Sequence, residues 1–460
     1  MSDVTGAVIL AAGQGTRMRS HRAKILLELA GRPFLEHVLG RASALSLSSV
    51  VVVTGFDAER VEELVGTRAA TVRQPGVLGT GDAVRRALHL LPPDVDRVLV
   101  LYGDCPLVPE PLLQSLLDRA ASGSTGAILL TAVMSDPSGR GRIIRDPAGH
   151  LVRIVEEKEA DSDERLIREI NTGIGLWPRA HLERILPSLP SHDGEQYLTD
   201  AVAALLAEGV AVDVVEAFDP EPVMGINTRE ELARAEAYMR RETNTRLMAS
   251  GVTLVDPATT YIDPEVVIGM DTVVLPMTTI RGRTVIGENA RIGPMATIVD
   301  SEVGDQVVVG SSTVESSHLM AHVVVGPYSH LRAGTYLERD VYIGNYVELK
   351  NARMGLGSKA GHHCYLGDVT VGSHVNIGAG TVIVNYDGVH KHPTFIGDDA
   401  FIGCNVNLVA PVEVGRGAYV AAGSTVDRAV PADSLAIARA RQEVKSDWAR
   451  TRRESQATRK

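Results

Sequence analysis

Aromatic side chains are scarce in this sequence. Phe, Trp and Tyr supply 4% of the 460 residues, although 44% of all residues are hydrophobic. A chain of this length can bury a large core, and here Val, Ile, Leu and Ala must fill it. Glycine is plentiful instead, at 44 residues, well above its usual share of about 7%. We therefore expect cores of aliphatic side chains and a backbone with many tight corners.

The sequence also lacks paired cysteines, long apolar runs and an excess of positive charge. Its three cysteines, Cys105, Cys364 and Cys404, are scattered and lack the spacing of a zinc site, which indicates a reducing compartment. No apolar stretch approaches the roughly 18 residues of a membrane span, and no basic segment precedes one at the N-terminus. The net charge of −11 argues against bulk nucleic-acid binding. We expect a cytoplasmic protein with no membrane span and no nucleic-acid partner.

Residues 1–228 alternate between short apolar runs and amphipathic segments. AVILAAG, SSVVVVTG, DRVLVLYGD and GAILLTAVM read as strands that are apolar on both sides, which is typical of buried parallel strands. Helical patterns such as GTGDAVRRALHLL lie between them. This alternation predicts a doubly wound, Rossmann-like α/β sheet.

Two charged segments flank the second half of the chain. Residues 229–250 are rich in helix formers and precede Gly251, so they read as a helical linker. Residues 438–460 carry many Lys and Arg, and read as a solvated or partly disordered tail.

Residues 251–437 repeat an aliphatic residue followed by glycine. Many intervals between these pairs are six or eighteen residues, and a small residue often lies four places after the aliphatic one. Such a hexapeptide repeat is typical of a left-handed parallel β-helix, in which three hexapeptides form one triangular coil. The pairs begin at Ile268, Ile286, Ile292, Val303, Val309, Val325, Ile343, Leu366, Val371, Ile377, Ile396, Ile402 and Val414. Departures from the interval predict protruding loops such as 385–393.

A glycine-rich loop follows the first predicted strand. Gly13 and Gly15 allow backbone amides to approach phosphates, and Arg17 and Lys24 can neutralise them. The loop lies at the carboxyl end of a strand, where open α/β sheets bind ligands, and Asp104 follows another strand at the same edge.

The run LAAGQGTRM with a downstream lysine resembles the sugar-nucleotide pyrophosphorylases. The resemblance implies that Arg17 and Lys24 stabilise a pyrophosphate leaving group, and that Asp104 and Asn227 hold Mg²⁺, which prefers oxygen ligands. The nucleotide and its sugar are then expected at Leu10, Ala11, Ala12, Gly13, Lys24, Gln74, Gly79, Thr80, Tyr102, Gly103, Asp104, Gly141, Glu156, Asn171 and Asn227.

The repeat region carries its own candidate site. An eighteen-residue interval places Arg332 and Lys350 on successive coils of one face, with Tyr365 close to them. Two stacked cations repel each other unless an anion lies between them, and a phosphate fits that position. His362 is close in sequence and can act as a base near neutral pH.

Together, the two halves resemble the bacterial bifunctional enzymes that join a glucosamine-1-phosphate N-acetyltransferase to an N-acetylglucosamine-1-phosphate uridylyltransferase. The resemblance runs from about residue 5 to residue 440. It implies a homotrimer, with His362 as general base and with Arg332, Lys350, Tyr365 and Asn376 on the sugar phosphate. Asn385 and Tyr386 are expected to line the sugar site and the coenzyme. Contacts with acetyl-CoA are further expected at Ala379, Cys404, Ala422 and Arg439, with the Ala379 amide polarising the thioester.

This sequence departs from the family pattern at four places. Cys404 stands where many relatives have serine, and Ala333 stands where proline is commoner. His363 and Cys364 differ from the usual residues, and Arg140 replaces a common tyrosine.

Three alternatives remain open from the sequence. The chain could be a single-activity nucleotide-sugar pyrophosphorylase whose β-helix is structural or regulatory. Histidines at 318, 322, 330, 362 and 363 allow a zinc-dependent β-helix enzyme with a metal between subunits. A non-catalytic binding module is the third reading, against which the intact phosphate and metal motifs argue.

Overall fold

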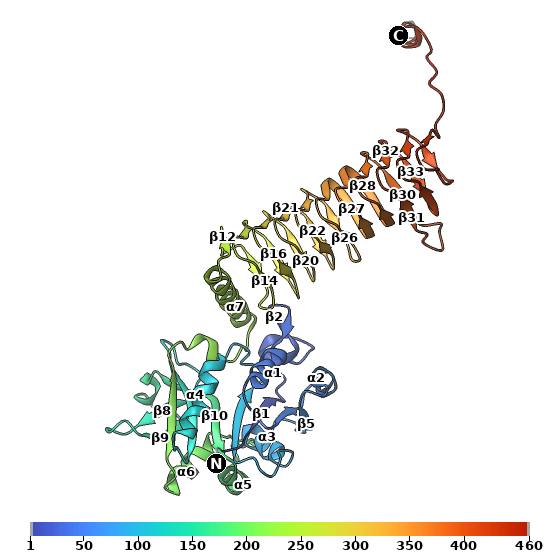
Figure 1. Ribbon diagram of the computed structural model, residues 1–460. Coiled ribbons are helices and arrows are strands. Elements are labelled where there is room, and N and C mark those ends of the chain that lie inside the picture. The colour runs from blue at the N-terminus through green and yellow to red at the C-terminus, as the bar shows by residue number, and fades with distance from the viewer. Residues whose placement is uncertain (1–2, 458–460) are drawn as a thin grey trace. The chain divides into compact units, whose positions relative to one another are not determined.

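The computed structural model describes residues 3–457 and divides the chain into two compact units (Figure 1). The first unit ends at Met239 and the second begins at Arg240. Among the described residues, no helix is both long and apolar enough to cross a membrane.

The first unit is built on a nine-stranded sheet. Its main strands follow the order β11-β7-β10-β6-β1-β4-β5, and a β8–β9 hairpin attaches beside β10. All of the main pairings are parallel except those of β10, which is antiparallel to both neighbours. The strands are β1 (Thr5–Ala11), β4 (Val50–Thr54), β5 (Ala70–Arg73), β6 (Arg97–Tyr102), β7 (Ala127–Val133), β8 (Arg142–Arg145), β9 (Leu151–Val155), β10 (Glu169–Pro178) and β11 (Val212–Ala217).

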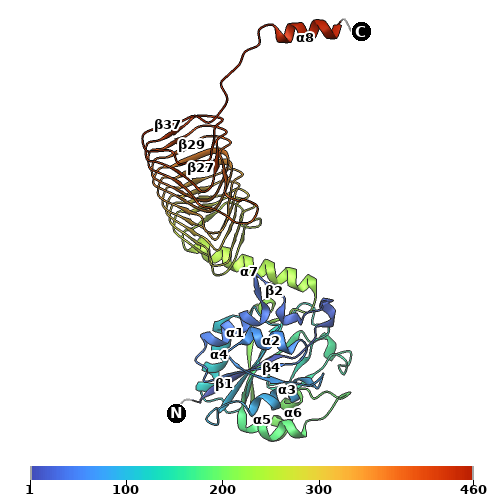
Figure 2. The same ribbon diagram turned by 90° about the vertical axis from the view of Figure 1, so that its right-hand side faces the viewer.

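Helices cover both faces of this sheet (Figure 2). One layer contains α1 (Phe34–Ala44), α2 (Ala58–Val65) and α4 (Glu110–Ala121), and the other contains α3 (Gly79–Leu88), α5 (Arg179–Ile185) and α6 (Asp200–Ala207). Successive residues of β1 enter opposite cores: Ile9 packs in the first layer and Val8 in the second, both fully buried. This two-sided burial explains why the strands are apolar throughout, and it confirms the doubly wound α/β fold.

Helix α7 (Arg229–Ala249) is the helical arm that the sequence predicts. It begins with a capping box: the Thr228 hydroxyl accepts a hydrogen bond from the Glu231 backbone N–H, and the Glu231 carboxylate accepts one from the Thr228 N–H. The same carboxylate accepts the N–H of Asn227 at 2.6 Å. The start of the helix therefore also fixes the backbone of a candidate site residue.

The second unit is a parallel β-helix of short strands, from β12 (Thr253–Leu254) to β37 (Leu435–Ala436). Most strands pair with the third strand along the chain, so three short strands complete one coil. Aliphatic residues eighteen positions apart stack inside it, as in the pairs Ile268↔Ile286 and Ile280↔Ile298. Within the described residues, the core of this unit contains no aromatic side chain. The expected aliphatic prism is confirmed.

Two longer strands interrupt the regular coils. β27 (Tyr342–Met354) and β28 (Lys359–Val371) pair in parallel along most of their length, and their contact brings Asn345 opposite His362. Gly344 needs to be glycine, because a Cβ there would overlap the carbonyl oxygen of Gly361.

The last irregular segments are an insertion and the tail. Residues 385–393 lie between β30 (Val382–Val384) and β31 (Thr394–Ile396), where the sequence predicts a loop. The tail contains one exposed helix, α8 (Trp448–Ala457), which the sequence analysis did not predict. Its last residues, 458–460, lie outside the described part of the chain.

Candidate active sites

The glycine-rich loop after β1 packs against the segment that carries Lys24. Gly15 has a φ of +69°, and a Cβ on it would lie 2.5 Å from the Cβ of Lys24. Glycine is therefore required twice here, by the left-handed backbone and by the close approach. The packing holds Lys24 at the first position of the short 3₁₀ helix η2 (Lys24–Leu26).

A cavity of about 240 Å³ opens beside this loop. Ten of the predicted nucleotide-site residues line it together: Leu10, Ala11, Ala12, Gly13, Lys24, Gln74, Gly79, Thr80, Tyr102 and Asp104. Glu195 and Tyr197 also line it, although the sequence analysis missed them. Because Gly79 and Thr80 form the first turn of α3, the positive end of that helix faces the cavity.

Gly103 and Arg17 are placed differently. Gly103 donates its N–H to the Leu10 carbonyl at 2.9 Å, so it joins β1 to the end of β6 without lining the cavity. Arg17 lies exposed in the 3₁₀ helix η1 (Thr16–Met18), also outside the cavity lining.

Three polar side chains converge at the edge of the same cavity. The Lys24 ammonium donates to the Asp104 carboxylate and, at 2.7 Å, to the Asn227 amide oxygen. The Lys24 and Asp104 side chains are 11% and 18% exposed. Gly225 packs against this group, since a Cβ on Gly225 would lie 3.2 Å from Asp104 Oδ2. The two predicted metal ligands therefore face one point, where a lysine cation lies.

The predicted sugar-binding residues form a neighbouring group. The Asn171 N–H donates to the Gly141 carbonyl at 2.9 Å, and a Cβ on Gly141 would lie 3.3 Å from the Glu156 carboxylate. Burial raises the pKa of Glu156, although a hydrogen bond from the Thr199 hydroxyl opposes the effect. Gly141 thus lies beside both Asn171 and Glu156, and none of the three lines the nucleotide cavity.

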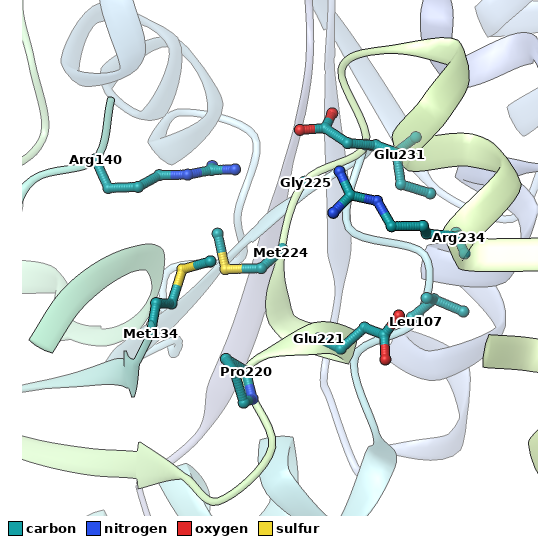
Figure 3. Close-up of a pocket in the computed structure, with 11 residues that line it drawn as sticks. Leu107, Met134, Arg140, Pro220, Glu221, Met224, Gly225, Glu231 and Arg234 are labelled. Carbon is teal, nitrogen blue, oxygen red and sulfur yellow. The ribbon is translucent and has the colours of Figure 1, made fainter. Parts of the chain in front are cut away.

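A second cavity, of about 290 Å³, is shown in Figure 3, and its wall includes Gly225, which lies beside Asp104. Gly225 and Glu231 belong to its wall, together with the apolar side chains of Leu107, Met134 and Met224. Arg140 extends into it (Figure 3). The sequence analysis identified Arg140 as unusual but did not predict this cavity.

On the β-helix, a histidine is oriented by its neighbour on the next coil. The Nδ1 atom of His362 lies 3.0 Å from the Oδ1 atom of Asn345. An amide oxygen only accepts, so Nδ1 carries the proton and Nε2 is left as the basic nitrogen. His362 is exposed to solvent, whereas Cys364, two residues on, is buried and its pKa is raised by burial.

Three cations gather further along β27, around Lys350. The pKa of Lys350 is lowered, first by its hydrogen bond with Lys391 and then by charge repulsion from Lys391 and Arg332. Arg332 is paired with the Glu348 carboxylate at 3.0 Å. The sequence analysis predicted Arg332 and Lys350 but missed Lys391, which lies on the 385–393 insertion. A concentration of positive charge of this kind suits a phosphate.

The side chains of Tyr365 and Asn385 meet beside Gly367. A Cβ on Gly367 would lie 2.5 Å from the Tyr365 hydroxyl and 2.8 Å from Asn385 Nδ2. Asn385 also donates to the Asp368 carboxylate at 2.6 Å. Within one chain, Asn385 therefore lies with the sugar-phosphate residues. Tyr386 is exposed, and its hydroxyl donates to the Gly388 carbonyl.

The other predicted coenzyme residues follow one corner of the β-helix. A Cβ on Gly378, the neighbour of Ala379, would lie 2.6 Å from the backbone nitrogen of Cys404. A Cβ on Gly403, in turn, would lie 2.6 Å from the nitrogen of Ala422. Arg439 lies beside Gly423, the residue that follows Ala422 in the chain. Asn376 is exposed on β29 (Asn376–Ile377), which pairs with β28.

Comparison with known proteins agrees with this division. The MobA-like NTP transferase domain family matches residues 7–203, and the family of bacterial transferase hexapeptides (six repeats) matches residues 265–300 and 393–428. The bifunctional protein GlmU of Heliobacterium modesticaldum is 45% identical over 445 residues, covering 96% of this chain and 97% of that protein. The GlmU protein of Symbiobacterium thermophilum is 45% identical over 466 residues, covering 100% of this chain and 99% of the relative.

This chain belongs to the GlmU family. GlmU membership confirms the bifunctional interpretation: the chain is a glucosamine-1-phosphate N-acetyltransferase and an N-acetylglucosamine-1-phosphate uridylyltransferase. Nothing in the comparisons favours the single-activity alternative. Within residues 3–457, no three His, Cys, Asp or Glu side chains lie together as a metal site would require, so the zinc alternative gains no support within one chain.

Proposed function

We propose that the two reactions use the two residue groups described above. The cavity beside β1 takes UTP and N-acetylglucosamine 1-phosphate, and the His362 face of the β-helix takes glucosamine 1-phosphate and acetyl-CoA. The observation that carries the assignment is the arrangement on the β-helix. A base with a free Nε2 and a group of three cations both lie along the paired strands β27 and β28, a combination that a purely structural β-helix does not need.

In the uridylyl site, the protein positions groups and neutralises charge. A phosphate oxygen of the sugar phosphate attacks the α-phosphorus of UTP, and the bond to the pyrophosphate oxygen breaks. The loop after β1 and the first turn of α3 offer backbone N–H groups to the phosphates. Arg17 and Lys24 stabilise the leaving pyrophosphate, and Glu156 and Asn171 bind the sugar.

The residues present fit a magnesium ion. The oxygens of Asp104 and Asn227 converge on one point, and a cation, the Lys24 ammonium, already contacts both of them. Mg²⁺ commonly binds through one or two protein oxygens plus water and substrate phosphates. Bound by this pair, it would supply positive charge against the reacting phosphates.

In the acetyl site, His362 removes a proton from the substrate amine. Its Nε2 accepts the proton while the amine nitrogen attacks the thioester carbonyl, and the bond from carbon to sulfur then breaks to release coenzyme A. Arg332, Lys350 and Lys391 hold the sugar phosphate, with Tyr365, Asn376 and Asn385 beside the sugar. The Ala379 amide polarises the thioester carbonyl, and Cys404, Ala422 and Arg439 contact the coenzyme along their corner.

The proposal includes a homotrimer and a cytoplasmic location. Hexapeptide repeats favour oligomers. Acetyl-CoA would bind between two subunits, whose residues, Tyr386 among them, would together complete the acetyl site. The free state of all three cysteines agrees with a reducing compartment.

The test is to disable each site separately in the full-length protein. His362→Ala should lower acetyl transfer by about 10²–10⁴-fold, the usual contribution of a general base, and leave uridylyl transfer unchanged. Asp104→Ala should do the reverse. Equal loss of both activities in either variant would contradict the two-site assignment, provided that both variants melt at the wild-type temperature.

A further inference from the structure

The most unusual feature of the first unit is a lysine that lies where a metal is expected. Lys24 Nζ contacts one oxygen of Asp104 and one of Asn227, the two groups that converge on the proposed magnesium position. A metal ion that bound the same two oxygens, Asp104 Oδ2 and Asn227 Oδ1, would meet the positive charge of the ammonium at contact distance. Any ion that binds there must displace the lysine.

Burial makes this displacement energetically important. Both side chains of the Lys24–Asp104 pair are largely shielded from water. Removing one partner from such a pair leaves an uncompensated buried charge, which is strongly unfavourable. A divalent ion would compensate Asp104, and the freed ammonium would then need another anion.

That anion is available in the adjoining cavity. Lys24 itself lines the cavity, together with Gly13 of the glycine-rich loop and Thr80 at the start of α3. A nucleoside triphosphate in this cavity would present phosphate oxygens to the released ammonium. The same lysine therefore has two alternative partners, one before metal binding and one after nucleotide binding.

We infer that the Lys24 ammonium is a built-in counter-ion that occupies the metal position, and that a divalent cation and a nucleoside triphosphate bind cooperatively by displacing it together. This inference rests on the proposed metal site. In the nucleotide-free protein, the Lys24 ammonium makes metal binding weaker than the two oxygen ligands would otherwise allow.

The experiment measures Mn²⁺ binding to the full-length protein without nucleotide, from the loss of the free-ion EPR signal. Mn²⁺ replaces Mg²⁺ because both prefer oxygen ligands. Lys24→Met and Lys24→Gln remove the competing charge, and each should bind Mn²⁺ about tenfold tighter than wild type, since no buried pair must then be broken.

Arg140→Met is the matched control. Arg140 lines the cavity next to the Asp104 group but makes no hydrogen bond to its carboxylate in the described structure. Its removal changes the local field without freeing the metal position, so its affinity for Mn²⁺ should stay within about twofold of wild type. Lys24 variants that gain no more than Arg140→Met would overturn the inference, because the effect would then be one of general charge.

A measurement on the wild-type protein avoids any effect of substitution on folding. Acetic anhydride labels free amines, and peptide mass spectrometry reports the labelled fraction. Mn²⁺ should increase labelling of Lys24 and leave the exposed Lys158 unchanged. Unchanged labelling of Lys24 at saturating Mn²⁺ would also overturn the inference.

One further variant separates this inference from the proposed function. Asp104→Asn should weaken Mn²⁺ binding. If it binds Mn²⁺ as wild type does, the metal site itself is misplaced and both proposals fail. If it binds weakly while the Lys24 variants match wild type, the metal site stands and only the counter-ion role is refuted.

Discussion

Replacement of Asn345 by alanine should slow acetyl transfer without changing substrate affinity. The side chain of Asn345 orients the His362 ring through the hydrogen bond of 3.0 Å from Nδ1 to Oδ1. As the proposed base, His362 would become an imidazolium in the reaction, and hydrogen bonds to charged groups contribute about 1.5–3 kcal/mol. Because the pair is solvent-exposed, water can partly replace the amide, which favours the lower value. About 1.5 kcal/mol corresponds to roughly a tenfold decrease in kcat.

The assay is thiol release from acetyl-CoA in the presence of glucosamine 1-phosphate. Of the protein's own cysteines, Cys105 and Cys364 are buried and Cys404 is exposed, so Cys404 sets the background. Asn345→Asp keeps an oxygen acceptor and should stay within about threefold of wild type, while both variants keep the wild-type KM for the two substrates. Wild-type kcat in Asn345→Ala, or an equal loss in Asn345→Asp, would refute the orienting role.

Two further predictions concern loops that shape the sites. Asp387→Asn should raise the KM for glucosamine 1-phosphate in acetyl transfer only. Asp387 accepts hydrogen bonds from the N–H groups of Val389 and His390 and from the His392 ring, and these bonds fix the loop that carries Lys391. These bonds, the His390 N–H first, lower the pKa of Asp387 to about 2. The contacts made by the ionised Asp387 carboxylate are therefore present above its pKa in the unfolded chain and are lost only as the pH falls toward 2. A wild-type KM that rises between pH 8 and pH 5, in step with opening of this loop, would contradict this. Gly79→Ala should raise the KM for UTP by about tenfold or more and lower the melting temperature, because its Cβ would overlap the Gln196 carbonyl in addition to the strain of a left-handed backbone. Gly76→Ala has the same φ of +88° but nothing within 4 Å, so equal effects in the two variants would exclude the clash as the cause.

The fold was largely predictable because its signals are local. Apolar runs such as Val50–Thr54 and the aliphatic–glycine repeat each specify a strand and its burial within a few residues. The direction of β10 was not predictable in this way. Its sequence contains strand-forming residues, but whether a strand runs parallel or antiparallel depends on the connection that brings it to its neighbours.

The candidate sites were predictable where a motif is continuous along the chain. The loop that ends in Gly13 belongs to such a motif, and it lines the nucleotide cavity. Contacts that depend on coil register were not predictable. Asn345 meets His362 only because β27 and β28 pair in one register, and Lys391 reaches Lys350 from a non-periodic insertion.

In both proposed sites, a cation that we assign to phosphate binding is paired with a carboxylate, but the two pairs differ in burial. Arg332 and Glu348 are 43% and 42% exposed, and a surface pair of this kind contributes at most about 1 kcal/mol. A sugar phosphate can therefore attract Arg332 from Glu348 at little cost. Lys24 and Asp104 are 11% and 18% exposed, so their separation requires a replacement charge on each side. Under this proposal, the acetyl site is ready for its anionic substrate as it stands, whereas the uridylyl site requires a divalent cation and a nucleotide to bind together.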